Sequence, residues 1–222
     1  MTLATLVVLA AFVWLGQWQW QRGMARAATW VQFQHDSAAV HGATRFDEMQ
    51  RFARVSFDCT YERPQFLLDN RPHAGRPGYE VLTPCALDDG RRVLVNRGWV
   101  PFTGRLDRLP DIALTVTRTA VRGRLDELPV GGLASGHAAP DPNAPWPRVT
   151  SYPTRAELES SLGVKLPQRI VLLDPDAAGG YVREWSPPGL APERHFSYAI
   201  QWWGFAVVLL VLSFGLNFRK VP

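Results

Sequence analysis

The chain has 222 residues, 46% of them hydrophobic, and its 24 Lys and Arg against 20 Asp and Glu give a formal net charge of +4. The basic residues are scattered and form no cluster or stripe, so the footprint of a nucleic-acid-binding protein is missing. The apolar residues gather at the two ends of the chain, a distribution typical of a membrane protein with a polar middle.

The first apolar segment, residues 2–20, carries no charge. At about 1.5 Å per helical residue it matches a hydrocarbon core about 30 Å thick, and it predicts a transmembrane helix over residues 1–22. A cleaved signal peptide is the alternative, because Ala25-Arg26-Ala27 resembles a cleavage site. No Lys or Arg precedes the apolar run, and the run exceeds the roughly 7–15 residues of a signal-peptide core. An uncleaved anchor is therefore favoured.

The segment that follows lacks proline and predicts a helical stem over residues 23–45. From Arg51 on, short β-rich pieces alternate with turn signals such as Asp88-Asp89-Gly90, which is typical of a hairpin. This texture predicts an antiparallel sheet curled into a small barrel or sandwich. The six predicted strands cover residues 53–61, 65–70, 78–85, 91–100, 119–128 and 168–174.

Residues 129–147 are too rich in Gly and Pro for regular structure and predict an exposed loop. A short helix is expected after them, because Thr154 and Glu157 form a capping box and Gly163 supplies a C-terminal stop. From Asp174 the chain is again expected to be extended.

Cys59 and Cys85 fall on the apolar phase of two alternating strands and should point inward. The simplest interpretation is two buried thiols. A disulfide is the alternative if the middle of the chain lies in an oxidising compartment. A copper or redox site is disfavoured, because no C-x-x-C spacing is present.

The second apolar segment, residues 200–218, ends at Arg219 and Lys220 and predicts a transmembrane helix over residues 195–220. Two spans place both termini on one side of the membrane, and the basic pair indicates that this side is the cytoplasm. Residues 46–194 then form a periplasmic (intermembrane-space-type) β-rich domain. Since Arg greatly outnumbers Lys, as in GC-rich bacteria, we expect the bacterial inner membrane.

The predicted fold class is therefore a membrane protein of the α+β type: two transmembrane helices flank an extramembrane antiparallel β-barrel or sandwich-like domain with one or two short helices.

Catalytic motifs are absent from the sequence. The serines occur in no G-x-S-x-G or S-x-x-K context, and no two histidines stand three or four residues apart as in a zinc site. The phosphate-binding patterns G-x-x-x-x-G-K and G-x-G-x-x-G are missing as well. We therefore expect no enzyme.

A polar and aromatic cluster is predicted at the outer edge of the membrane. Counting about twenty residues outward from Arg219 places His195 just beyond the hydrocarbon, at the level of Trp18 and Arg22 on the first helix. His195, Tyr198 and Trp202 share one helix face.

A neutral imidazole beside aromatic surface suits a haem, which needs an axial ligand and cover for the macrocycle. Arg22 and Arg194 could bind the propionates. The alternative is an interfacial histidine with no special role, beside tryptophans of the ordinary membrane belt.

Four motifs occur in one order along the chain: L-G-x-W-Q-x-x-R at 15–22, G-Y-x-V-L-T-P at 78–84, V-N-R-G-W-V-P at 95–101 and H-x-x-Y-A-x-Q-W at 195–202. With them the chain resembles the surfeit-locus protein one family, the assembly factors of cytochrome c oxidase. Where that family continues its first motif with a Trp-Lys pair, this chain has Ala25 and Arg26, which keep the charge but not the aromatic ring.

The resemblance implies a non-enzymatic factor that helps to provide haem a to the catalytic subunit of cytochrome c oxidase. The haem a synthase is a second candidate partner, and membrane lipid surrounds the helices. The histidine of the last motif is the suspected iron ligand of the family, here His195. We expect haem a to be bound transiently between the two helices by His195, Tyr198, Gln201, Trp202, Trp18 and Arg22.

Three alternatives stay open at this stage. The protein could be a haem-independent membrane scaffold for a nascent oxidase subunit. Gln201 could bond across to Gln19 or Trp18 and hold the helices together. A periplasmic copper carrier is disfavoured, because paired Cys or Met ligands are lacking.

The third motif has a structural and a functional interpretation. A buried strand that ends in Gly98, Trp99 and Pro101 suits a barrel corner, with Arg97 neutralising an acid such as Asp69. The alternative is a docking surface for the oxidase subunits or the haem a synthase.

Overall fold

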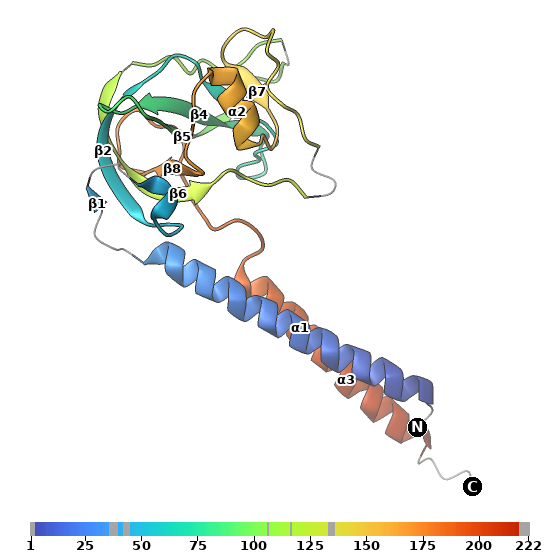
Figure 1. The fold of residues 1–222 in the computed structure, drawn as a ribbon. Coiled ribbons are helices and arrows are strands. Elements are labelled where there is room, and N and C mark those ends of the chain that lie inside the picture. The colour runs from blue at the N-terminus through green and yellow to red at the C-terminus, as the bar shows by residue number, and fades with distance from the viewer. Residues whose placement is uncertain are drawn as a thin grey trace. The chain divides into compact units, whose positions relative to one another are not determined.

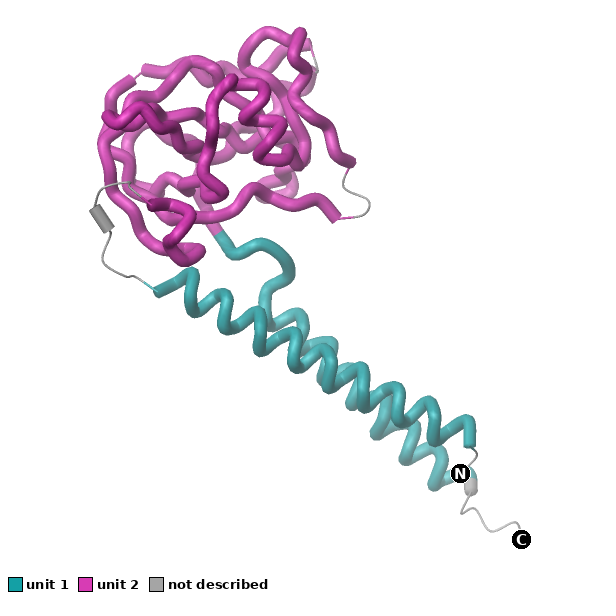
Figure 2. The backbone as a smooth tube through the Cα atoms, viewed as in Figure 1, with its two compact units in different colours: residues 1–35, 186–222 teal, residues 36–185 magenta. Residues whose placement is uncertain are grey.

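The structure is a computed structural model that describes residues 3–35, 40–41, 45–105, 107–115, 117–132 and 136–217. The chain forms two compact units (Figure 2). Unit 1 comprises Met1–His35 and Ser186–Pro222, and unit 2 comprises Asp36–Trp185.

Unit 1 is a pair of long helices, α1 (Leu3–Gln34) and α3 (Pro192–Asn217), which lie side by side (Figure 1). Contacts between them run in opposite chain directions, so the helices are antiparallel: Gly23 meets Phe196, and Phe12 meets Phe205. Both are long and apolar enough to cross a membrane, which confirms the two predicted spans.

The helical stem is shorter than predicted. Helix α1 continues past residue 22 but ends at Gln34, and Val40–His41 form the short strand β1 rather than a helix. The remaining stem residues 36–39 and 42–44 lie outside the described part of the chain, as do residues 218–220 of the second predicted span.

The two helices share a heptad-like seam. Buried and half-buried positions repeat with alternating spacings of three and four residues, the pattern of a coiled-coil contact face. On α1 they are Leu9, Phe12, Gly16, Gln19, Gly23, Arg26 and Trp30, and on α3 they are His195, Ala199, Trp202, Ala206, Leu209 and Ser213. Small residues seven positions apart let the two backbones approach closely: Gly16 and Gly23 on α1, and Ala199, Ala206 and Ser213 on α3.

Unit 2 is built on an eight-stranded sheet in the order β1-β2-β6-β8-β5-β4-β3-β7. An additional pairing between β2 and β4 closes five of the strands into a barrel. The elements besides β1 are η1 (Phe46–Glu48), β2 (Arg54–Tyr61), β3 (Phe66–Leu68), β4 (Gly78–Ala86), β5 (Arg92–Pro101), β6 (Arg118–Glu127), β7 (Arg148–Thr150), α2 (Arg155–Leu162) and β8 (Arg169–Leu173).

All six predicted strands are present, and the barrel-like architecture is confirmed. Five of the strand pairings described are antiparallel, as predicted. Three were not expected, because β1–β2, β3–β7 and β5–β8 pair in parallel. Parallel neighbours need long crossovers, and local hairpin signals do not reveal such pairings. Strands β1 and β7 were not predicted.

The predicted local signals of unit 2 are confirmed. Strands β4 and β5 form the hairpin around Asp88-Asp89-Gly90. Thr154 and Glu157 make the reciprocal bonds of a capping box at α2, and Gly163 ends the helix in the left-handed conformation. The described part of the Gly- and Pro-rich segment, residues 129–132 and 136–147, contains no helix and no strand beyond an isolated bridge at Ala138.

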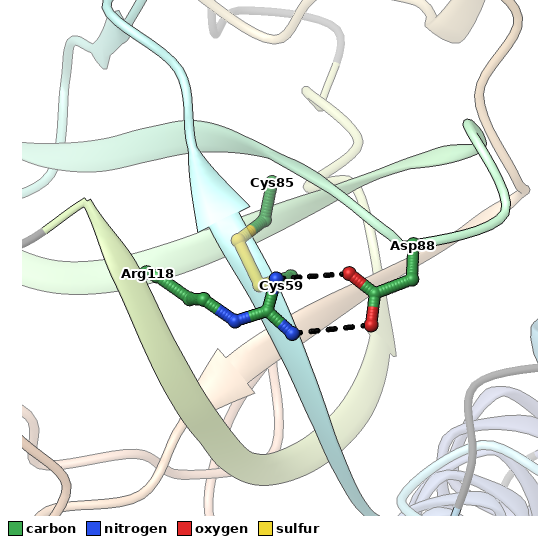
Figure 3. The surroundings of a disulfide bond; sticks show 4 residues. All are labelled: Cys59, Cys85, Asp88 and Arg118. Atoms are coloured by element: carbon green, nitrogen blue, oxygen red, sulfur yellow. Dashed lines mark hydrogen bonds and ion pairs between the residues drawn. A yellow bond between two sulfur atoms is a disulfide. The ribbon is translucent and has the colours of Figure 1, made fainter.

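Cys59 and Cys85 form a disulfide, with their Cα atoms 5.6 Å apart (Figure 3). The preference for two free thiols was therefore wrong. Both side chains are fully buried, as the strand alternation predicted. The bond joins β2 to β4 beside Thr60↔Ala86 and Tyr61↔Cys85, the only two residue pairs that the described strands form across this junction. The disulfide thus fastens the barrel where it closes.

The third motif is part of the barrel core. Arg97 is 3% exposed, and its guanidinium donates to the Gly179 carbonyl at 2.7 Å and to Gln65 Oε1 at 3.1 Å. It also lies over the rings of Tyr61 and Tyr181, whose faces attract a cation. The predicted pairing with Asp69 was wrong, because a carbonyl, an amide and two aromatic faces stabilise the charge instead.

The rest of this motif is also buried, except for Pro101. Trp99 donates its indole N–H to the Arg71 carbonyl at 2.6 Å and packs on Gly78. Gly98 has a φ of +110°, and a Cβ there would lie 2.6 Å from the Val182 carbonyl oxygen, so this corner requires glycine. These contacts support the structural interpretation of the motif.

Candidate functional site

The candidate site is centred on a hydrogen bond between the two helices of unit 1. His195 lies in the first turn of α3, and its Nδ1 is 2.9 Å from Gln19 Oε1 on α1. An amide oxygen can only accept, so Nδ1 carries a proton, and in the neutral ring Nε2 then keeps its lone pair. Among the described residues, Nε2 has no hydrogen-bond partner. The imidazole therefore presents a free nitrogen ligand.

Local sequence explains why α3 starts just before His195. Pro192 suits the first helical position because its missing N–H would have no intrahelical partner there. Glu193 in the first turn complements the positive end of the helix dipole. On the other helix, Arg26 donates to the Pro188 carbonyl at 2.9 Å and packs on Gly189, which anchors the segment that leads into α3.

Aromatic rings define one flank of the helix pair. Trp20 on α1 contacts Phe196 and Trp203 on α3, with ring centroids 4.8 and 5.8 Å apart. Phe196 and Trp203 in turn lie over Gly23 and Gly16. We call this side the Trp20 flank.

The other flank carries most of the predicted site residues. At about 100° per residue, Trp18 and Arg22 lie across the α1 seam from Trp20. Tyr198 and Gln201 lie across the α3 seam from Phe196 and Trp203 by the same geometry. Because Trp20, Phe196 and Trp203 share one side, these four residues share the opposite side, which we call the Trp18 flank.

The Trp18 flank is open and carries a cation. Trp18 is 39% exposed and Tyr198 is 42% exposed, while Arg22 lies 5.3 Å from the Trp18 ring centroid. Trp202 is half-buried at the seam and stacks against Phe12 at 5.7 Å. The six residues predicted from sequence thus lie along the seam and on one flank.

Three details differ from expectation. Gln19, and not Gln201, makes the bond across the helices, and Gln201 is exposed without a hydrogen bond to the described residues. Gln19 was missed as part of the site, although it occupies the seam position between Gly16 and Gly23. The expected gap between the helices is also missing there, because a Cβ on either glycine would overlap an aromatic ring of α3.

These residues fit a haem on the flank better than a haem between the helices. A free Nε2, flat aromatic surface and a neighbouring guanidinium are what an axial ligand, a macrocycle and a propionate require. A site with several protein ligands for a bare metal ion is not supported, since the described residues contain no group of three or more His, Cys, Asp or Glu.

Two surface hollows among the described residues of unit 2 contain none of the predicted residues. One, of about 320 Å³, lies around Phe46, Leu87 and Lys165. The other, of about 650 Å³, lies around Gln65, Ile112 and Trp146. Neither contains a histidine or a free thiol.

Two antiparallel apolar helices and a small closed barrel between them in sequence define a two-pass membrane protein of the α+β class. A comparison with family models matches residues 6–207 to the SURF1 family. The chain belongs to this family, which is linked to the assembly of cytochrome c oxidase and comprises assembly factors. A search of curated proteins found no match.

Proposed function

We propose that this protein binds haem a through His195 during the assembly of cytochrome c oxidase and passes it to the catalytic subunit. The observation that carries the proposal is the His195 ring, whose Nδ1 is engaged by Gln19 while Nε2 is free. A histidine that ligates iron usually donates its other N–H to an oxygen acceptor. A bound haem would supply an iron centre for the free Nε2 of His195 to ligate.

The Trp18 flank is the proposed resting place for the porphyrin. Trp18, Tyr198 and Trp202 offer aromatic cover, and Arg22 and Arg194 offer cations to the propionates. Gln201 presents an amide in the same area, where it can hydrogen-bond a polar substituent of haem a. This arrangement replaces the groove between the helices that we expected from sequence.

A delivery protein must also release its cargo. A single histidine on a face that is open to lipid holds haem less firmly than a closed pocket with two axial ligands, so transient binding follows from the site. The haem a synthase is the proposed source of the cargo, and the oxidase subunit is the recipient.

We place the protein in the bacterial inner membrane, with both termini in the cytoplasm and unit 2 in the periplasm. The disulfide supports this orientation, because such bonds persist in oxidising compartments. A reporter enzyme that is active only outside the cytoplasm, inserted after the exposed Val130, should be active. A stable fusion without reporter activity would indicate the opposite topology, with unit 2 in the cytoplasm.

The test of haem binding is to purify the protein from cells that make haem a and to record its visible spectrum. His195→Ala should reduce the bound haem at least tenfold, whereas His137→Ala, which changes an exposed histidine of unit 2, should leave it unchanged. If the two variants bound equal amounts of haem, the assignment of His195 as the iron ligand would be wrong.

A haem-independent scaffold is the second candidate, and the closed seam at Gly16 and Gly23 favours it, since the helices need no cofactor to pack. In that case the His195→Ala variant supports normal oxidase assembly in cells. Loss of assembled oxidase in the same variant, at normal protein level, supports the haem proposal.

A further inference from the structure

We infer that Gln19 is the positioning residue of the haem site, which selects the tautomer of His195 and presents Nε2 as the ligand. The inference rests on the proposed function for the identity of the bound group. The tautomer itself is a property of the protein without haem, so it can be tested separately.

The position of Gln19 is unusual for its residue type. It occupies a seam position between Gly16 and Gly23, where the other described contacts of the helix pair are formed largely by aromatic and small residues. A polar residue in such a seam costs stability and is retained for specificity. Here the polar residue forms a 2.9 Å hydrogen bond with His195, so we infer that Gln19 is retained to orient this histidine.

The direction of this bond decides what His195 can do. If the amide oxygen of Gln19 accepts, the proton lies on Nδ1 and Nε2 is a ligand. If the amide nitrogen donated instead, the proton would lie on Nε2 and block it. In the structure the oxygen of Gln19 faces Nδ1, which is the arrangement that leaves Nε2 able to ligate iron.

A second histidine shows the contrast. Both ring nitrogens of His137 are engaged, by the Tyr152 carbonyl at 3.1 Å and by Glu157 Oε1 at 2.9 Å. That imidazole has no nitrogen left for a metal. His195 differs because a single acceptor holds one nitrogen and leaves the other without a hydrogen-bond partner among the described residues.

An acceptor on Nδ1 also adjusts the ligand. It increases the basicity of Nε2, which strengthens binding to ferric iron and lowers the reduction potential. Removal of such a partner typically costs about 10–100-fold in metal affinity. A carboxylate in place of the amide accepts more strongly and should lower the potential further.

The first experiment uses the haem-free protein in detergent, labelled with ¹⁵N-histidine, in mildly alkaline buffer so that neutral tautomers are compared. Long-range ¹H–¹⁵N correlation spectra should show His195 protonated on Nδ1. Gln19→Leu should shift it toward the Nε2-protonated form. A wild-type ring protonated mainly on Nε2 overturns the inference, whatever the protein does with haem.

The second experiment titrates haem a into the wild type, Gln19→Leu, Gln19→Glu and the control Gln21→Leu, whose glutamine is exposed on the side of α1 away from the seam. We expect about 10–100-fold weaker binding for Gln19→Leu, a lower midpoint potential for Gln19→Glu, and no change for the control.

The outcomes separate the two claims. If Gln19 served helix packing alone, Gln19→Leu would bind haem more weakly, but the midpoint potential of haem in Gln19→Glu would equal that of the wild type. That result would overturn the positioning role. Unchanged haem binding by His195→Ala would contradict the proposed function. The tautomer of His195 is measured in the haem-free protein, so that result tests the role of Gln19 independently.

Discussion

Gly16 on α1 and Trp203 on α3 touch so closely that a single Cβ at residue 16 would overlap the indole ring. The same relationship recurs one heptad away, where a Cβ on Gly23 would lie 2.5 Å from Cε1 of Phe196. The two spans are therefore held by backbone-to-ring packing, the kind of contact that associates helices in lipid.

Gly16→Leu should separate the helices at this level. Overpacking of a close contact costs about 1–3 kcal/mol, so the variant should unfold at lower temperature in detergent. Gly204→Leu is the matched control, because nothing lies within 4 Å of a Cβ at that position on α3. Equal melting of the two variants would contradict the close seam.

The two flanks should differ in haem binding. Trp18→Ala removes an exposed ring from the proposed haem side, and we expect weaker binding of haem a in a spectroscopic titration. Trp20→Ala removes an indole from the opposite flank, where it packs on Phe196 and Trp203. If Trp20→Ala lost more affinity than Trp18→Ala while both variants folded equally well, the haem would lie on the Trp20 flank and the proposed location would be wrong.

The disulfide should be a main source of stability in unit 2. It links cysteines 26 residues apart, and closing a loop of that size stabilises a fold by about 3.5 kcal/mol in the chain-entropy model. The double variant Cys59→Ser/Cys85→Ser should therefore unfold at a clearly lower denaturant concentration than the oxidised protein. Unchanged unfolding would mean that β2 and β4 stay paired without the bond.

Arg97 should be indispensable to the barrel. Its replacement by Met leaves the Gly179 carbonyl without its donor, while the Gln65 oxygen still accepts from the Thr83 hydroxyl. A buried group left unsatisfied costs about 1–3 kcal/mol. Burial raises the pKa of Tyr61 to about 12, although the Arg97 charge opposes the rise. The variant should thus lose stability in chemical unfolding and raise this phenol pKa further, while Arg63→Met, at an exposed position, should do neither.

His137 should make the stability of the region around α2 depend on pH. Hydrogen bonds to the Tyr152 carbonyl and Glu157 raise the pKa of His137 above its ordinary 6.5. Burial acts to raise the pKa of Glu157, but bonds from Thr154 and His137 outweigh it and lower the pKa below 4.5.

The direction in which stability changes with pH follows from these two pKa shifts. The histidine contribution is fully present below pH 6.5 and is lost as the pH rises through the raised value, while the glutamate contribution is present above pH 4.5 and is lost below it. The difference in stability between the wild type and His137→Ala should therefore be largest between these values and should shrink as the pH rises through the raised pKa of His137. A difference that is constant from pH 5 to 9 would contradict the pairing.

Several features could be read from the sequence because they depend on neighbours in the chain. The two charge-free apolar runs are long enough to span a membrane wherever they occur. The capping box of Thr154 and Glu157 and the turn at Asp88-Asp89-Gly90 act within a few residues. The inward direction of both cysteines follows from strand alternation.

Other features were decided by tertiary structure alone, since they join residues far apart in the chain. The register that brings Cys59 to Cys85 depends on barrel closure, and the parallel pairing of β5 with β8 depends on the path between them. The partner of His195 lies 176 residues away on the other helix. Periodicity placed His195 on a face of its own helix, but only the packing of small residues against aromatic rings determined that Gln19 meets it and that no porphyrin-sized space lies between the two helices at Gly16 and Gly23.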